Sequence, residues 1–428
     1  MKKNILVVGP ALSQSGYGVH ARTVLRSLKS RGDLFEIFIH NLNWGQTSWL
    51  WEDDEERRWI DERMLATVHH QQAQGTYDAS IQVTIPNEWK KLAPINIGCT
   101  AGIEATKITP QWVQQSYLMD KIIVVSNFAR EGFINTVHEM VNEQTGEKVE
   151  VAAKGPIEVV NYPHVPAQPE EIDLNLTSDF NFLLVSQWSP RKNFENTIRW
   201  FIEEFIDQDV GLVVKTSTAN NSYLDFLHTK NRVQQLLQDP KYADRKCKVS
   251  LLHGYLTKGQ LQSVYTHPKV KCLINIAHGE GFGLPIFEAA GAGLPVLTIG
   301  WGGQADFLYM PEKKKGSKKK TMTAKFAEVD FTVGSISPEA VWEGVLHADA
   351  SWAFPEQGSF KMKLRDVYKK YRVYKNRAAA LKSHIQSEFT EEKKFAEFCA
   401  HLEEYLTEDI TRDDSWLSEV ADIVKEYE

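Results

Sequence analysis

The segment NIAHGEGFGLPIFEAAGAGLPV contains the residues best suited to chemistry. Its apolar start predicts a strand, a glycine-rich loop follows, and its first proline suits the first turn of a helix. Gly281 and Gly283 allow a ligand to approach the backbone closely, and the free N–H groups at a helix start favour a diphosphate there. Glu280 and Glu288 place two carboxylates beside that phosphate, which indicates that they accept hydrogen bonds from the hydroxyls of a sugar and a ribose.

A second segment of interest is VSQWSPRKNFENTIRWF, in which Arg191 and Lys192 precede an expected helix and follow an expected strand. Two cations at that place can neutralise a departing diphosphate. Such a pair on its own is usually a solvated surface feature. The distance along the sequence between this pair and the glutamate segment favours a functional interpretation.

The elements that must position these residues alternate between strands and helices. Short apolar runs predict strands near residues 5–9, 35–40, 120–126, 180–187, 210–216, 247–254, 271–277 and 295–300. Helices are expected over residues 19–32, 194–206, 222–238, 258–265 and from residue 285 onward. Alternation of this kind predicts mostly parallel sheets with helices on both faces. Ligands of such folds bind at the carboxyl ends of the strands, so both segments are expected to meet there.

The alternation stops where Pro163, Pro166 and Pro169 cluster, which predicts a domain boundary. The expected fold class is α/β, with two Rossmann-like doubly wound domains that face a cleft. We expect an N-terminal domain over residues 1–162, a linker over 163–178, a second domain over 179–385, and C-terminal helices with an acidic tail over 386–428. That last part is a candidate to pack back on the N-terminal domain.

Composition excludes several classes of protein. Hydrophobic residues make up 42% of the 428 residues and charged residues 25%, which excludes a mainly disordered chain. The net charge of −7 arises in the tail, because residues 403–428 contain ten acids against Arg412 and Lys425. Four scattered cysteines indicate buried thiols, and no apolar run is long enough for a membrane span. A soluble, cytoplasmic protein is therefore expected.

The glutamate segment resembles the main signature of glycosyltransferase family 4, the retaining nucleotide-sugar transferases of GT-B fold. The E-G-F-G-L-P…E pattern matches from Glu280 to Glu288. The resemblance implies that Glu280 contacts the hydroxyls of the transferred sugar and Glu288 contacts the ribose. It also implies that the backbone of Gly281, Phe282 and Gly283 lies against the diphosphate and sugar, with Leu284 in the same donor-binding motif.

The basic pair also matches this family, in which Arg191 and Lys192 would act on the leaving diphosphate. The sequence departs just upstream, where Ser186-Gln187 stands in place of the Gly-Arg of many members. Gly16 and Gly18, in the loop after the first strand, resemble the family's donor-phosphate loop, although a lone G-x-G is also an ordinary strand–helix turn.

A fourth match is the run IGCTAGIEATKITPQWVQQSYLMDKIIVVSNFAREGF. The resemblance places acceptor-side or sugar contacts on several of its residues and on two others. These are Tyr17, Glu104, Thr106, Ser126, Asn127 and His278. Many members carry a histidine near the position of Glu104, and none is present here. A packed histidine is the alternative interpretation of His278.

The resemblance implies a mechanism without a bound metal or other cofactor. The departing diphosphate oxygen takes the proton of the acceptor hydroxyl while that hydroxyl attacks from the same face. The donor would be a UDP- or GDP-sugar. The sequence agrees with a mechanism without a metal, since it lacks a convincing Asp-x-Asp at a strand end. The acidic segment WEDDEE, residues 51–56, is interpreted as a helix face and not as a metal site.

The acceptor stays open at this stage. The IPNEW and TAGIEATK segments and the lysine run from Lys313 to Lys320 resemble transferases encoded by tailed phages. One candidate acceptor is a hydroxymethylated pyrimidine in DNA, with the lysine run as a phosphate-attracting arm in the host cytoplasm. The rivals are a transferase of cell-surface glycan or lipopolysaccharide synthesis, and a non-catalytic carbohydrate- or nucleic-acid-binding module. A GT-B epimerase or phosphorylase is disfavoured by the combination of the two glutamates with the basic pair.

Overall fold

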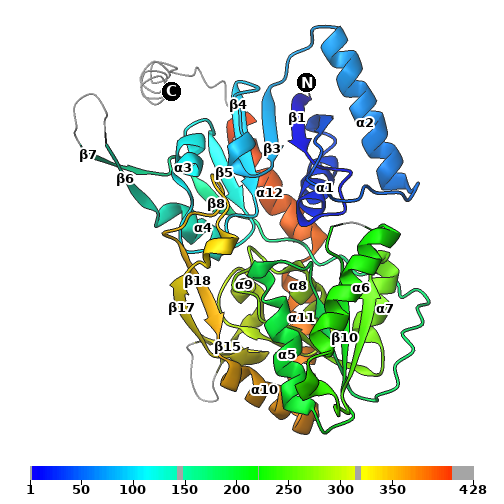
Figure 1. Ribbon diagram of the computed structural model, residues 1–428. Helices are drawn as coiled ribbons and strands as arrows, with labels where there is room; N and C mark the ends of the chain where they lie inside the picture. The colour runs from blue at the N-terminus through cyan, green and yellow to red at the C-terminus, as the bar shows by residue number, and fades with distance from the viewer. Residues whose placement is uncertain (1, 142–147, 220, 314–319, 407–428) are drawn as a thin grey trace.

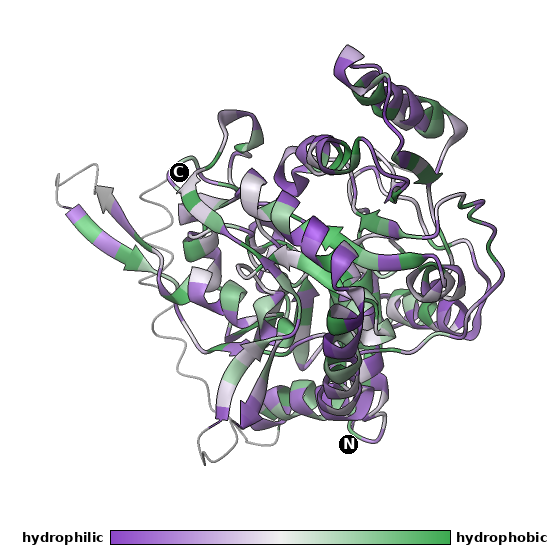
Figure 2. Ribbon diagram, turned by 90° about the horizontal axis from the view of Figure 1, so that it is seen from below, coloured by the Kyte–Doolittle hydropathy of each residue, from purple (hydrophilic) through white to green (hydrophobic). Residues whose placement is uncertain are grey.

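The computed structural model describes residues 2–141, 148–219, 221–313 and 320–406. Two six-stranded parallel sheets dominate it, one in the upper half of Figure 1 and one in the lower half. Figure 2 shows hydrophobic residues concentrated on the strands and more hydrophilic ones on the helices around them. The predicted α/β class with two Rossmann-like domains is confirmed.

The first sheet has the strand order β2-β1-β3-β4-β5-β8, and all of its neighbours are parallel. Its strands are β1 (Lys3–Gly9), β2 (Phe35–Asn41), β3 (Ala79–Val83), β4 (Ile95–Thr100), β5 (Lys121–Val124) and β8 (Ile157–Val159). Helices α1 (Gly16–Lys29), α2 (Glu55–Gln72), α3 (Pro110–Ser116) and α4 (Asn127–Ile134) connect them, with a short 3-10 turn η1 (Pro86–Glu88). A hairpin of β6 (Val137–Val141) and β7 (Lys148–Ala152) projects from this domain (Figure 1).

The second sheet has the order β11-β10-β9-β12-β13-β16 and is also parallel throughout. Its strands are β9 (Asn181–Val185), β10 (Gly211–Thr216), β11 (Lys248–His253), β12 (Val270–Asn275), β13 (Val296–Ile299) and β16 (Ala327–Val329). Its helices are α5 (Phe194–Phe205), α6 (Tyr223–Leu237), α7 (Lys258–Thr266), α8 (Leu284–Ala292), α9 (Ala305–Leu308), α10 (Gln357–Lys369) and α11 (Tyr371–Glu388). The domain also contains the 3-10 turns η2 (Pro190–Lys192), η3 (Pro240–Tyr242) and η4 (Pro338–Ala340). Two antiparallel hairpins complete it, β14 (Tyr309–Lys313) with β15 (Lys320–Ala324) and β17 (Phe331–Ser335) with β18 (Ser351–Pro355).

Several segments of the C-terminal half contact the first domain, among them its last described helix and one hairpin. Helix α12 (Glu391–Leu406) packs against α1, and its Phe398, Cys399 and Leu402 join the apolar core of the first domain. The β17–β18 hairpin also reaches across, because Thr106 N donates to Ser351 O and Ser351 N donates to Thr106 Oγ1, both at 2.9 Å. The two domains are therefore joined by packing as well as by the connecting chain.

Helices α1 and α2 begin at residues that differ from the expectation. Helix α1 starts at Gly16, three residues before the expected start, because Ser15 caps it by accepting a hydrogen bond from Gly18 N. Helix α2 starts at Glu55 with Asp54 as its cap, so the preceding acids lie in a loop and not on a helix face as expected. In the described part of the chain, no helix is long and apolar enough to cross a membrane.

Candidate functional site

The two sequence segments meet because β9 and β12 are neighbours in the centre of the second sheet. Arg191 and Lys192 lie in η2, shortly after β9, while Glu280 lies in the loop after β12. Parallel strands bring their carboxyl ends to one edge of a sheet, which is where these loops converge. His278 N donates to Arg191 O at 2.8 Å, so the loops are also bonded through the backbone.

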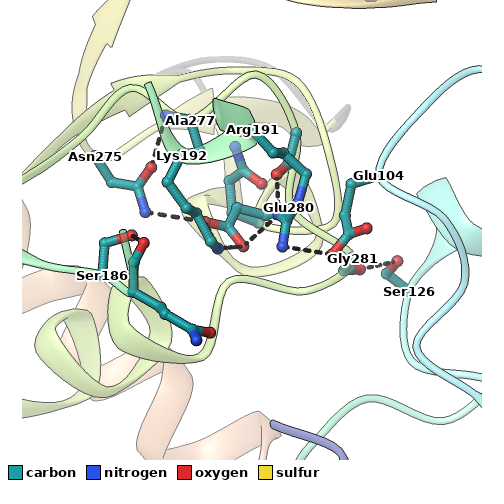
Figure 3. Close-up of polar contacts among 12 residues, drawn as sticks. Glu104, Ser126, Ser186, Arg191, Lys192, Asn275, Ala277, Glu280 and Gly281 are labelled. Carbon is teal, nitrogen blue, oxygen red and sulfur yellow. Dashed lines mark hydrogen bonds and ion pairs between the residues drawn. The ribbon is translucent and has the colours of Figure 1, made fainter. Parts of the chain in front are cut away.

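Glu280 is the centre of a buried polar cluster (Figure 3). Its two carboxylate oxygens lie 2.6 and 2.7 Å from Lys192 Nζ, and Asn275 Nδ2 donates to it at 3.1 Å. Only 5% of the residue is exposed. Burial alone would raise the pKa of this carboxyl, but Lys192, Arg191 and the donated hydrogen bonds outweigh it and lower that pKa. Glu280 is therefore held ionised in a desolvated position.

Arg191 connects this cluster to the first domain. Its Nη1 donates to Gly279 O at 2.7 Å and lies 3.6 Å from Glu280 Oε2. Its Nη2 lies 3.0 Å from Oε1 of Glu104, which comes from the chain after β4 in the other domain (Figure 3). A single guanidinium thus contacts carboxylates of both domains.

The glycine-rich loop lies directly against the first domain. A Cβ on Gly279 would lie 2.3 Å from Glu104 O, and one on Gly281 would lie 2.5 Å from Ala101 O. Ser126, which caps the start of α4 in the first domain, donates from its Oγ to Gly281 O over 2.6 Å (Figure 3). Any side chain at either glycine would separate the two domains.

The loop then turns into α8 through Gly283, whose φ of +87° favours glycine. The side chain of Phe282 packs inward, with ring centroids 5.0 Å from Tyr162 and 5.1 Å from Phe287. From Gly281 to Gly283 the part of this loop that can face a ligand is therefore its backbone, together with the first N–H groups of α8, beginning at Leu284.

Glu288 lies apart from the Glu280 cluster, on the wall of a cavity of about 260 Å³ between the two domains. Tyr265 OH donates to its Oε2 at 2.9 Å. Burial raises the pKa of this carboxyl, although Tyr265 and the nearby Lys215 and Lys258 oppose that effect. The same cavity is bordered by α1, the loop before α2, the connecting segment after β8 and the start of α7.

The α1 candidates lie beside the loop after β4. Tyr17 OH lies 2.8 Å from Thr100 Oγ1 and accepts from Ala101 N at 3.3 Å, and burial raises the pKa of its phenol. A Cβ on Gly18 would lie 1.9 Å from Ser13 O, whereas one on Gly16 would meet open space. Gly16 therefore leaves a free approach to the start of α1, and Gly18 serves packing within the domain.

Three other candidates have contacts outside the Glu280 carboxylate, Thr106 and Asn127 between the two domains and His278 within the second domain. Thr106 is bonded to the β17–β18 hairpin, as described above. Asn127 donates to Asp306 Oδ2 from its backbone N at 2.9 Å. His278 stacks on Trp352 with ring centroids 4.6 Å apart, and burial and Arg191 lower its pKa. The packed interpretation of His278 agrees with these contacts.

Sequence reasoning missed two residues that support the cluster. Asn275, at the end of β12, binds Glu280 and also accepts from Ala277 N at 2.9 Å. Asn193 adopts φ +49° after η2, and its Nδ2 donates to Ile276 O at 3.2 Å. An asparagine at a strand end and one directly after a basic pair are signals that could have drawn attention to both.

Within the described ranges, no group of three or more His, Cys, Asp or Glu side chains is arranged to hold a metal ion. Lys313 and Lys320 pair with each other across the β14–β15 hairpin. The rest of the lysine run, residues 314–319, and the acidic tail from residue 407 lie outside the described residues.

Comparison with known proteins relates this arrangement to solved glycosyltransferases. Sucrose-phosphate synthase from Thermosynechococcus elongatus superposes with a TM-score of 0.60 at 12% identity, over 95% of this chain and 100% of that one. The catalytic domain of starch synthase IV from Arabidopsis thaliana, bound to ADP and acarbose, gives 0.55 at 11% identity, over 95% and 100%. HepE from Anabaena, in complex with UDP-glucose, gives 0.53 at 13% identity, over 94% and 100%.

Sequence comparison adds no closer relationship. No family model matches the chain, and no curated protein matches it. The resemblance to family 4 and to phage-encoded transferases stays a prediction. At 11–13% identity the structural similarity shows the fold alone, and on that basis the chain has the GT-B fold, two Rossmann-like domains packed across a shared cleft.

Proposed function

We propose that this protein is a retaining glycosyltransferase that moves a sugar from a UDP- or GDP-sugar to an acceptor hydroxyl. The observation that carries the proposal is the cluster of the half-buried Arg191 and Lys192 around the buried Glu280, beside the start of α8. Cations and a helix start suit a diphosphate, while an ionised carboxylate suits sugar hydroxyls. Few other ligands combine these two requirements in one molecule.

The proposed mechanism uses charge placement and needs no separate base. As the bond between the anomeric carbon and the diphosphate oxygen breaks, negative charge grows on that oxygen. Arg191, Lys192 and the N–H groups at the start of α8 stabilise this charge because they are already in position. The acceptor hydroxyl attacks from the same face and gives its proton to the departing oxygen, so the configuration is retained.

The roles of the two glutamates differ in this proposal. Glu280, ionised and fixed by Lys192 and Asn275, accepts hydrogen bonds from hydroxyls of the transferred sugar. Glu288, on the cavity wall, accepts from the ribose. Glu104 and Ser126 lie where the first domain meets this loop, which suits the acceptor side of the reaction.

The test is donor turnover with purified protein. We expect release of nucleoside diphosphate from a UDP- or GDP-sugar, and a loss of two or more orders of magnitude in Glu280→Ala and Lys192→Ala. Lys361→Ala is the matched control, because Lys361 makes a similar ion pair with Glu203, 2.5 Å from Nζ to Oε2, near the other end of α5. Unchanged turnover in the two site variants would contradict the proposed site. A folded protein that neither hydrolyses nor transfers any donor would favour a binding module.

The proposed acceptor, a hydroxymethylated pyrimidine in DNA, rests on the phage-type resemblance alone. Such a base must leave the stack to reach the cleft, and cationic side chains would hold the phosphates. Surface-glycan synthesis is the rival, because a glycan hydroxyl suits the same centre.

Incubation with duplex DNA that contains hydroxymethylcytosine or hydroxymethyluracil, followed by digestion and mass spectrometry, separates the two. A nucleoside shifted by the mass of one sugar supports the DNA acceptor. No shift, under conditions where the donor is hydrolysed, excludes it. If transfer occurs, replacing the six lysines of residues 313–320 by Ser should flatten its salt dependence.

A further inference from the structure

The cavity beside Glu288 contains polar groups that the proposed mechanism does not use. Two of them belong to the first domain and have no hydrogen-bond partner among the described residues, although both atoms are buried. These atoms are Nε2 of Gln14 and Oε1 of Glu52, and both residues line the cavity. Leaving a buried polar group unsatisfied costs roughly 1–3 kcal/mol, so an unused donor and an unused acceptor in one cavity indicate a ligand that satisfies both.

The fold brings these two residues together through paired loop segments. Gln14 N donates to Ser48 O and Leu50 N donates to Leu12 O, both at 2.8 Å, and Ser13 forms a bridge with Trp49. The amide of Gln14 is oriented by the second domain, because its Oε1 accepts from Asn221 Nδ2 at 3.3 Å. Its NH₂ group is therefore the part that remains for a ligand.

Tyr255 brings the second domain to the same place. It follows Gly254, which has φ +88° after β11, and it lines the cavity with Gln14 and Glu52. Burial raises the pKa of its phenol, and the negative charge of Glu52 together with a hydrogen bond to that carboxylate raises it further. Among the described residues, the atom of Glu52 without a partner is therefore Oε1 alone. An aromatic ring next to a free donor and a free acceptor provides a stacking surface beside a hydrogen-bonding edge.

Arg22 adds a second donor on the same wall. Its exposed fraction is 6%, and its hydrogen bonds among the described residues use only Nη1, to Ala11 O at 2.7 Å and Ser13 O at 2.9 Å. The cavity therefore has two sources of donors, Gln14 and Arg22, next to one free carboxylate oxygen.

We infer that Gln14 and Glu52 of the first domain select the base of the donor, and that the base carries a lactam edge, as uracil and guanine do. The inference rests on the proposed function, which places the ribose at Glu288. A lactam offers a carbonyl oxygen with two lone pairs, which accepts from both Gln14 and Arg22, and an N–H that donates to Glu52. Adenine presents a ring nitrogen with a single lone pair beside an amino group, so it leaves one donor unused. Cytosine has a carbonyl, but the ring nitrogen beside that carbonyl has a lone pair in place of an N–H, so this lone pair would face Glu52.

This arrangement has a consequence for where specificity resides. Glu288 and Tyr255 belong to the second domain, whereas the selecting side chains belong to the first. The protein can therefore discriminate between bases only when both domains enclose the cavity.

The experiment measures the dissociation constants of UDP, GDP, ADP and CDP by calorimetry, with wild type, Glu52→Ala, Gln14→Ala and Glu288→Ala. We expect UDP or GDP to bind at least about tenfold more tightly than ADP and CDP. Glu52→Ala and Gln14→Ala should remove this preference with little change for ADP. Glu62→Ala is the matched control, because Glu62 is exposed on α2 and does not line the cavity.

A methylated ligand measures the contribution of the lactam N–H to binding. Methylation at N3 of UDP, or at N1 of GDP, should weaken binding to wild type about tenfold but have little further effect in Glu52→Ala. The two parent nucleotides also distinguish a uracil site from a guanine site.

The outcomes separate the inference from the proposed function. Binding of all four nucleotides with equal affinity, or a preference that Glu52→Ala leaves intact, would overturn the inference and leave the glycosyltransferase proposal standing. Failure of all four to bind, with the protein folded, would overturn the proposed function and with it the inference. A uniform loss in Glu288→Ala supports the ribose position on which both depend.

Discussion

Gly281→Ala tests whether close contact between the two domains positions the reacting groups. No unusual φ restricts this glycine, so the added methyl group meets an obstacle only in the other domain. That obstacle is Ala101 O, 2.5 Å from the added Cβ. Because real Cβ contacts stay at or above 3.0 Å, the loop and the first domain must separate by at least 0.5 Å.

The separation acts on contacts that cross the cleft at the same place. Ser126 Oγ to Gly281 O is 2.6 Å, and Arg191 Nη2 to Glu104 Oε1 is 3.0 Å. A misplacement of about 1 Å can cost 10²-fold in rate, so 0.5 Å or more predicts a loss of about tenfold, or ~1.4 kcal/mol in the activation barrier. Overpacking should also lower the free energy of unfolding by about 1–3 kcal/mol.

The assay is donor turnover at saturating donor, with thermal unfolding measured on the same samples. Gly358→Ala is the matched control, since its Cβ meets nothing within 4 Å at the start of α10. It should keep full turnover and gain about 0.5–1 kcal/mol of stability from reduced backbone entropy in the unfolded state. If Gly281→Ala turns over as fast as Gly358→Ala while both remain folded, the contact between the domains does not position the site.

Three further predictions concern charge. Lys192→Ala leaves Glu280 buried with only Arg191 and Asn275 as partners, so it should lower the free energy of unfolding by about 3 kcal/mol. Adding Glu280→Ala to this variant should recover part of the loss, because the unpaired carboxylate is then removed. Denaturant titration measures both changes, and no recovery in the double variant would contradict the prediction. Because the pKa of Glu288 is raised in the folded protein, its contribution to the stability of the fold is present at low pH and is lost as the pH rises through that pKa. Nucleotide binding has the opposite dependence because it uses the ionised carboxylate, so it should weaken from pH 8 toward pH 5. Calorimetry with UDP over this range measures the effect, and an equal pH dependence in Glu288→Gln would refute it. Donor turnover should survive exhaustive chelation because Arg191 and Lys192 supply the positive charge; a complete loss that added metal restores would refute this.

The sequence predicted the local elements of the second domain closely. The expected helix over residues 194–206 is α5, from Phe194 to Phe205, and the strand expected over 210–216 is β10, from Gly211 to Thr216. Buried parallel strands must be continuously apolar and helices must carry an apolar stripe, so both patterns are visible in the chain itself. The glycines before α8 and the proline in its first turn were equally predictable, because backbone geometry restricts which residues fit there.

The sequence was less informative at element starts and in loops that carry acids. Helix α1 gains its first turn from the cap at Ser15, which outweighs the poor helix propensity of Gly16 and Gly18. Glu52 precedes α2 in a loop, although the run of acids around it looked like one helical face. Both differences arise because a single capping hydrogen bond decides where a helix begins.

Only the tertiary structure decided which side chains meet. Lys192 and Glu280 are 88 residues apart, and their pairing follows from β9 and β12 being neighbours, an order that no local pattern encodes. The contact of Arg191 with Glu104 and the facing of Gln14 and Glu52 toward the Glu288 cavity depend further on how two separate sheets pack against each other. Side-chain types and spacing along a chain determine what chemistry is available, but burial of two cores against one another determines which groups share a site.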